Sequence, residues 1–103
     1  MEQLREKINA SRNIKKITLE NYIRNIRLLC NATTGHDFDG DISFLKDITA
    51  IKAELIKKPL GTQKTLLASI SVIGGDCGLD ADILRKYRLT LKATKEIYAE
   101  GLA

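Results

Sequence analysis

The segment Gly61-Thr62-Gln63-Lys64-Thr65 holds a lysine followed by a threonine and then an apolar run, as a phosphate-binding loop does. A nucleotide-binding loop of that kind requires a glycine directly before the lysine and another glycine at its start. These two positions hold Gln63 and Lys58 here. The loop should also follow a buried strand, whereas the preceding residues have the spacing of a helix. The segment therefore does not predict a nucleotide-binding loop.

The segment His36–Asp41 alternates aspartate with other residues, which is how a calcium-binding loop begins. Counted from Asp37, the sixth position of such a loop requires glycine and the twelfth requires a bidentate glutamate. Those positions hold Ile42 and Ile48, so the calcium interpretation fails. The chain has one histidine, and no carboxylate–histidine pair recurs at helical spacing. We therefore expect no metal and no cofactor here, but a solvated loop that turns at Gly40.

Nucleophilic catalysis has no candidate residues, because no Ser/His/Asp or Cys/His arrangement occurs at a recognisable spacing. The two cysteines, Cys30 and Cys77, are not in a metal-binding spacing. Cys30 lies among apolar residues and is expected to be a small buried hydrophobe. These features predict a protein that is not an enzyme and that resides in a reducing, intracellular compartment.

Helix starts offer a second way to bind phosphate, because the first N–H groups of a helix carry partial positive charge. Thr18 and Thr62 are both predicted to be N-caps. Each has basic neighbours, which are Lys15 and Lys16 for the first, and Lys57, Lys58 and Lys64 for the second. Ordinary capping also explains both threonines. Their coincidence with charge favours the hypothesis that two helix starts on one face hold a nucleic-acid backbone.

The charge distribution supports a polyanionic partner. The chain has 103 residues and a net charge of +4. Residues 1–34 carry seven Lys/Arg against three Glu, and residues 49–75 carry four Lys against one Glu. The loop between them, residues 35–48, carries four Asp against one Lys, and residues 76–103 balance at five and five. Two basic segments separated by an acidic loop suit a surface that meets nucleic acid.

The elements that must position these residues are all expected to be helices, because apolar residues recur three and four apart and never alternate as in a strand. Hydrophobic residues make up 44% and aromatic residues 5%, so the core should be aliphatic. We predict an all-α, compact bundle of four main helices with a possible fifth, short one at the N-terminus. The predicted helices are a short one over 2–9, one over 19–31, one after the N-cap Asp47 that ends before Pro59, one from Gly61 that Gly74-Gly75 stops, and one capped by Asp80 or Asp82.

The last helix carries Leu84, Tyr87, Leu91, Thr94 and Tyr98 at heptad-like spacing, which predicts packing on the bundle. A second interpretation is that this seam of the 80–100 helix docks a partner protein or another copy of the chain. No run of apolar residues is long enough to span a membrane.

The order of these signals resembles the core-binding domain of tyrosine recombinases, the N-terminal SAM-like domain of phage-type and mobile-element integrases. The matching segments are KITLENYIRNIRLL (Lys16–Leu29), DISFLKDITAIKAELIKK (Asp41–Lys58) and GTQKTLLASISVI (Gly61–Ile73). Within them, Thr18 and Tyr22 match the start of the family's first helix. The closing segment ILRKYRLTLKATKEIYAE (Ile83–Glu100) looks like the last helix of such domains, especially in integrase-like proteins of large DNA viruses.

The resemblance implies a non-catalytic domain at residues 13–100 that clamps double-stranded DNA. It implies an arm or short helix at 1–12 and a tail or linker at 101–103. The family's catalytic residues belong to a second domain, and none can be placed here. Tyr22 is expected to pack on the core. The implied DNA contacts are Lys16, Thr18, Asn21, Arg24, Lys57, Lys58, Thr62, Gln63 and Lys64, and self-association in a recombination complex is a further expectation.

Overall fold

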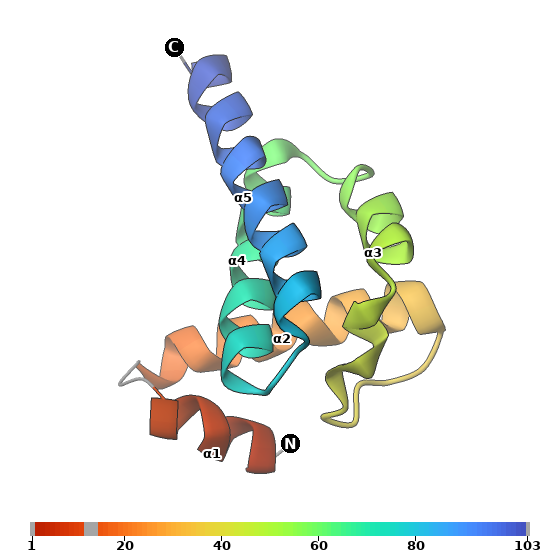
Figure 1. Ribbon diagram of the computed structural model, residues 1–103, viewed down its shortest axis with the longest axis vertical. Coiled ribbons are helices and arrows are strands. Elements are labelled where there is room, and N and C mark those ends of the chain that lie inside the picture. The colour runs from red at the N-terminus through yellow and green to blue at the C-terminus, as the bar shows by residue number, and fades with distance from the viewer. Residues whose placement is uncertain (1, 12–14, 103) are drawn as a thin grey trace.

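The computed structural model describes residues 2–11 and 15–102, and every regular element in those ranges is a helix (Figure 1). The elements are α1 (Glu2–Ser11), α2 (Lys16–Thr34), the 3-10 helix η1 (Ile42–Lys46), α3 (Ile48–Leu55), α4 (Leu60–Asp76) and α5 (Ala81–Leu102). The predicted all-α class and the short N-terminal helix are confirmed. The predicted domain boundary between residues 12 and 13 lies outside the described residues.

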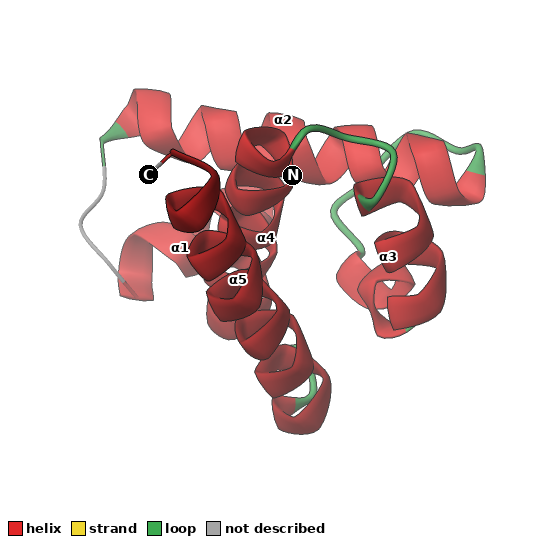
Figure 2. Cartoon of the chain, turned by 90° about the horizontal axis from the view of Figure 1, so that it is seen from above, coloured by secondary structure: helices red, strands yellow, loops and turns green. Residues whose placement is uncertain are grey.

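Helix α4 lies at the centre, packed between α2 on one side and α5 on the other (Figure 2). Helix α1 packs near the C-terminal end of α4, while η1 and α3 pack against α2 (Figure 1). The core is aliphatic as predicted, and Tyr87 is its largest fully buried side chain. The Tyr87 hydroxyl donates a hydrogen bond to the carbonyl of Leu45, which ties α5 to η1. Cys30 is buried, and Tyr22 packs partly buried against the core, both as predicted.

Two of the predicted N-caps are confirmed and two are wrong. The Asp47 carboxylate accepts from the Ala50 N–H, and the Asp80 carboxylate accepts from the N–H groups of Asp82 and Ile83. Thr18 and Thr62 do not cap, because α2 begins at Lys16 and α4 at Leu60.

The first backbone bonds show why these helices begin before the threonines. The Leu19 N–H donates to the Lys15 carbonyl, and the Gln63 N–H donates to the Pro59 carbonyl. Pro59 has φ −59°, which suits entry into a helix, and a proline has no N–H group to leave unpaired there. Each threonine is thus the third residue of its helix. At that position its hydroxyl cannot serve the first-turn N–H groups as an N-cap does.

The predicted stop at Gly74-Gly75 is also wrong, since α4 continues through both glycines to Asp76. Gly74 is buried, and a Cβ there would lie 2.9 Å from Leu79 Cδ2 and 3.3 Å from Leu84 Cδ1. Its missing side chain therefore makes room for the core. The turn falls instead at Gly78, whose φ is +83°, and the Leu79 N–H donates back to the Gly74 carbonyl. Helix α2 similarly outlasts its predicted end at Asn31 and stops at Gly35, with φ +76°.

The α5 seam packs on the bundle as predicted. Leu84, Tyr87 and Thr94 are buried, while Leu91 and Tyr98 are partly buried. The buried members of this seam are committed to the core of their own chain, so they are not a surface on which a partner can dock. The helix continues through Gly101 to Leu102, which places both residues in α5.

Candidate nucleic-acid interface

The predicted contacts on α2 do not form one face. Lys16, Asn21 and Arg24 are exposed, whereas Thr18 is partly buried. Thr18 and Arg24 are six residues apart, which at 3.6 residues per turn places them about 120° apart around the helix. Arg24 lines a small depression with Glu20, Ile23 and Arg27. Glu20, in the same depression, forms an ion pair with Arg5 of α1, whose Nε lies 2.8 Å from the Glu20 carboxylate. The hydrogen bond from Arg5 lowers the pKa of Glu20.

The predicted contacts around the start of α4 are mostly engaged within the chain. The Lys57 ammonium lies 3.0 Å from the Glu54 carboxylate. The Gln63 amide donates to the Lys58 carbonyl at 2.8 Å, so this side chain turns back toward its own backbone. Lys58 and Gln63 are half-buried, and Thr62 is exposed.

Lys64 is the member of the predicted set that the structure places against α5. Its Nζ lies 4.6 Å from the centroid of the Tyr98 ring, a cation–π arrangement. The contact holds a positive charge beside the C-terminal half of α5.

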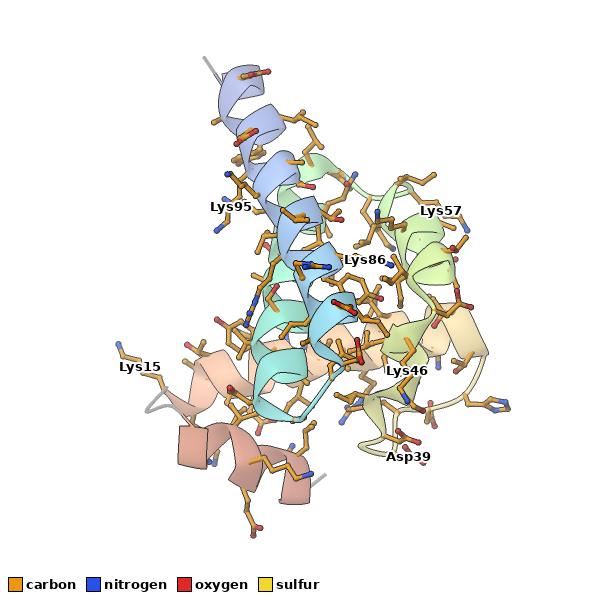
Figure 3. The ribbon with its side chains drawn as sticks, viewed as in Figure 1. Lys15, Asp39, Lys46, Lys57, Lys86 and Lys95 are labelled. Carbon is orange, nitrogen blue, oxygen red and sulfur yellow. The ribbon has the colours of Figure 1, made fainter. Side chains whose placement is uncertain are left out.

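The structure does not bring the two predicted helix starts together. In Figure 3, Lys15 lies beside the start of α2 at one edge of the molecule, and Lys57 lies just beyond the end of α3 at the opposite edge. The start of α4 lies beside the C-terminal half of α5, where Gly61 approaches Tyr98 (Figure 1). The hypothesis of a grip formed by both starts on one face therefore has no support from their positions. Each start is a separate place on the surface.

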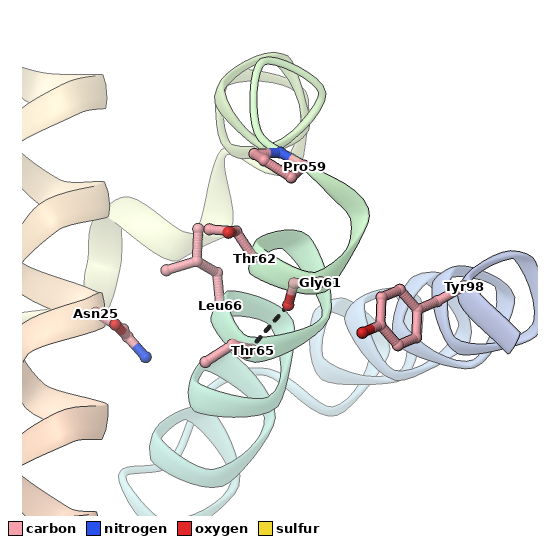
Figure 4. A pocket seen from close by; sticks show the side chains of 7 residues that line it. All are labelled: Asn25, Pro59, Gly61, Thr62, Thr65, Leu66 and Tyr98. Carbon is pink, nitrogen blue, oxygen red and sulfur yellow. Dashed lines mark hydrogen bonds between the residues drawn. The ribbon is translucent and has the colours of Figure 1, made fainter. Parts of the chain in front are cut away.

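A cavity of about 520 Å³ opens beside the first turns of α4 (Figure 4). Its lining comes from α2, α4, α5 and Pro59, and consists of Asn25, Pro59, Gly61, Thr62, Thr65, Leu66 and Tyr98. The Asn25 amide donates to the Ser69 hydroxyl at 2.9 Å, and the Thr65 hydroxyl donates to the Gly61 carbonyl at 3.1 Å. Two polar side chains in the lining are thus used to hold helices together and to close a helical turn.

Helix α5 carries a row of cations that the charge count of residues 76–103 did not predict. Arg85, Arg88, Lys92 and Lys95, the α5 basic row, are all exposed. Their spacing of three, four and three residues places them on one side of the helix. The five acidic residues that balance the charge of residues 76–103 lie before the row, at Asp76, Asp80 and Asp82, and after it, at Glu96 and Glu100. A plot of charge around the α5 helix would have found the row.

The row lies along the edge where α5 meets α4. The Arg88 guanidinium covers Gly75, with Nη2 3.2 Å from where a Cβ would stand. Lys95 projects from the side of α5 opposite to Lys86 (Figure 3). At the N-terminal end of the row, Arg85 lies 3.2 Å from Asp82, one turn earlier, in an exposed pair. An exposed ion pair of this kind is weak, so Arg85 can readily leave Asp82 to bind another anion.

The described residues contain no cluster of three or more His, Cys, Asp or Glu side chains that could hold a metal ion. Burial raises the pKa of the Tyr87 hydroxyl well above its usual range, so this tyrosine remains a neutral donor. In the part of the chain that the structure describes, no helix has both the length and the apolar character needed to cross a bilayer.

Comparisons of the chain with protein-family models, with curated proteins and with solved structures found no match.

Proposed function

We propose that this chain binds duplex DNA through the α5 basic row, as a non-catalytic helical domain of the kind that tyrosine recombinases use beside their catalytic domain. The observation that carries the proposal is the row itself. Four exposed cations lie on one side of a helix that Tyr87 fixes to the core. The finer fold type, a SAM-like core-binding domain, belongs to the same proposal and rests on the order of the motifs in residues 13–100.

The dimensions of the row suit a phosphate backbone. Arg85 and Lys95 are ten residues apart, which is about 15 Å along a helix at 1.5 Å per residue. A duplex strand carries one phosphate per roughly 3.4 Å of its axis, so the row covers the length of about four phosphates. The arginines provide planar, bidentate donors for phosphate oxygens, and the lysines provide point charges. A helix holds all four at fixed spacing, which reduces the ordering that binding requires.

The DNA contacts predicted from the sequence contribute to this proposal to different degrees. Lys64 adds charge beside Tyr98, close to the C-terminal half of α5. Lys16, Asn21 and Arg24 are exposed on α2, where they can contact DNA only as a second, separate surface. The contacts predicted for Lys57, Lys58 and Gln63 are weaker candidates, because an ion pair or burial already engages these side chains.

A salt titration of binding to a short duplex tests the proposal. Four phosphate contacts predict that log affinity falls with log salt at a slope of about −3.6. Lys92→Glu with Lys95→Glu should remove roughly two contacts, flatten the slope by about 1.8 and weaken binding at low salt at least tenfold. Both lysines are exposed, so the fold should be kept.

The matched control is Lys46→Glu with Lys52→Glu, which makes the same charge change on η1 and α3. It should weaken binding far less, since only the long-range field changes. Equal losses in both double variants would reduce the effect to net charge and reject the row. Absence of duplex binding at low salt would reject DNA binding altogether.

A further inference from the structure

Helix α5 has a third side, which is apolar and exposed. Leu89, Ala93 and Ile97 are four residues apart and form a stripe on the surface, the α5 outer stripe. Leu89 is 60% exposed and Ile97 is 53% exposed. This stripe is distinct from the seam of Leu84 and Tyr87, which is used up in the core. Two large aliphatic side chains aligned on one exposed helix side are typical of a contact with another helix.

The stripe is symmetric about Ala93. In an antiparallel pair of α5 helices centred on Ala93, residues equally far from Ala93 face each other. Leu89 of one copy then faces Ile97 of the other, and Lys86 of one copy faces Glu100 of the other. The small side chain of Ala93 stands at the centre, where the two helices come closest.

The charges on this side select both the partner and its direction. Lys86 and Glu100 are exposed, and fourteen residues separate them, about 21 Å along the helix. They are therefore too far apart to pair within one chain. An antiparallel second copy brings opposite charges together at both ends of the stripe. A parallel copy in register would place Lys86 against Lys86 and Glu100 against Glu100, which is repulsive.

We propose that the α5 outer stripe is occupied by a second copy of this chain, antiparallel about Ala93, with Lys86 and Glu100 pairing across the two copies. The contact leaves the α5 basic row available. Lys86 and Lys95 project from opposite sides of α5 (Figure 3). The inference does not depend on DNA binding, and its test contains no nucleic acid.

Charge exchange tests the pairing by sedimentation equilibrium of the full chain over a range of concentrations. Lys86→Glu and Glu100→Lys should each weaken self-association about tenfold, because each turns two attractive pairs of the symmetric contact into repulsive ones. The double variant restores both pairs with the signs exchanged and should return to near the original affinity. An effect through the fold of one chain would not show this rescue, since the two side chains do not meet within it.

Leu89→Gln with Ile97→Gln should abolish self-association, with helix content by circular dichroism unchanged because both residues are exposed. The matched control is Leu28→Gln, since Leu28 is 44% exposed on α2, and it should leave self-association intact. A chain that stays monomeric at all concentrations overturns the proposal. So does self-association that survives the glutamine substitutions, or a double charge variant that associates no better than either single variant.

Discussion

Helix α5 presents two exposed sides whose chemistry differs completely. One side carries Arg85, Arg88, Lys92 and Lys95 beside α4, and the other carries Leu89, Ala93 and Ile97 with an exposed charge of each sign near its two ends. The first suits a polyanion and the second suits another helix. Along the sequence, residues 76–103 carry five basic and five acidic residues, and this balance predicts neither surface. Helical periodicity sorts the same residues into separate sides, so the position around the axis matters more than the net charge.

Both exposed sides depend on the buried side of α5, which packs on the core, and Tyr87 is the main anchor of that buried side. Tyr87→Ala removes a fully buried ring and should lower the free energy of unfolding by about 3–5 kcal/mol. Tyr87→Phe keeps the ring but leaves the Leu45 carbonyl without its donor, which should cost about 1–3 kcal/mol. Chemical denaturation measures both. Under conditions where Tyr87→Ala begins to unfold, duplex binding and self-association should be lost together.

A loss of only one of the two activities in Tyr87→Ala would show that the two sides do not share this support. A cost below about 1 kcal/mol would mean that the core collapses around the missing ring more easily than close packing normally allows.

The two adjacent glycines of α4 have different neighbours. Gly74 faces buried leucines, and Gly75 faces Arg88 of the α5 basic row. Replacing glycine with alanine inside a helix stabilises by up to about 1 kcal/mol. At Gly74 the new methyl would lie 2.9 Å from Leu79 Cδ2 in the core, and overpacking of that kind costs about 1–3 kcal/mol. At Gly75 the closest atom is Nη2 of the exposed Arg88 guanidinium, at 3.2 Å, which can move, and Leu84 Cδ2 lies at an ordinary van der Waals distance of 3.8 Å. We therefore expect Gly74→Ala to destabilise and Gly75→Ala to stabilise in the same denaturation experiment.

Gly75→Ala also displaces a member of the α5 basic row without touching the outer stripe. It should change duplex affinity slightly and self-association not at all. Stabilisation by both alanines would show that Leu79 and Leu84 give way, and that Gly74 is not needed for packing.

The smallest expected effect comes from the ion pair between Arg5 and Glu20, which joins α1 to α2 away from both exposed sides of α5. Arg5 lowers the pKa of Glu20 in the folded chain. The contribution of the pair to stability is therefore present above the unfolded pKa of about 4.3 and is lost as the pH falls through the folded pKa. Glu20→Gln should flatten that part of the acid limb in denaturation midpoints measured between neutral and acidic pH.

Glu20→Gln should leave duplex binding and self-association at neutral pH unchanged. A change in either would mean that α1 influences α5 through α4, against which α1 packs.

The helices themselves could be predicted because their apolar spacing is local information. Leu19, Ile23 and Ile26 predict α2, and Leu84, Tyr87 and Leu91 predict the buried side of α5. The aspartate caps at Asp47 and Asp80 were also predicted, since a short carboxylate before an apolar run has few other roles. The threonine caps were wrong because Lys16-Ile17 and Leu60-Gly61 can join a helix just as well. For α4 the local signal was Pro59, whose φ of −59° suits entry into a helix, but the prediction used this proline only to end the preceding helix.

The candidate surface was predicted less well than the fold. The nine predicted contacts were chosen because they lie near two helix starts in the sequence. In the structure the starts of α2 and α4 lie apart (Figure 1). Lys57 pairs with Glu54, and the Gln63 amide bonds to the Lys58 carbonyl. The spacing of Arg88, Lys92 and Lys95 was sufficient to predict the α5 basic row. The net charge of residues 76–103 is zero and therefore gave no indication of it.

By itself, the sequence determined an aliphatic, all-helical chain, the buried side of each main helix, and the acidic loop that divides two basic segments. These properties depend on residue type and on the 3.6-residue period, which act within a few turns. The tertiary structure alone decided that Gly74 stays inside α4 to make room for Leu79, and that the predicted helix starts lie apart. It also decided which two sides of α5 remain exposed. Such outcomes depend on packing between segments distant in the chain, and local propensity contains no information about that packing.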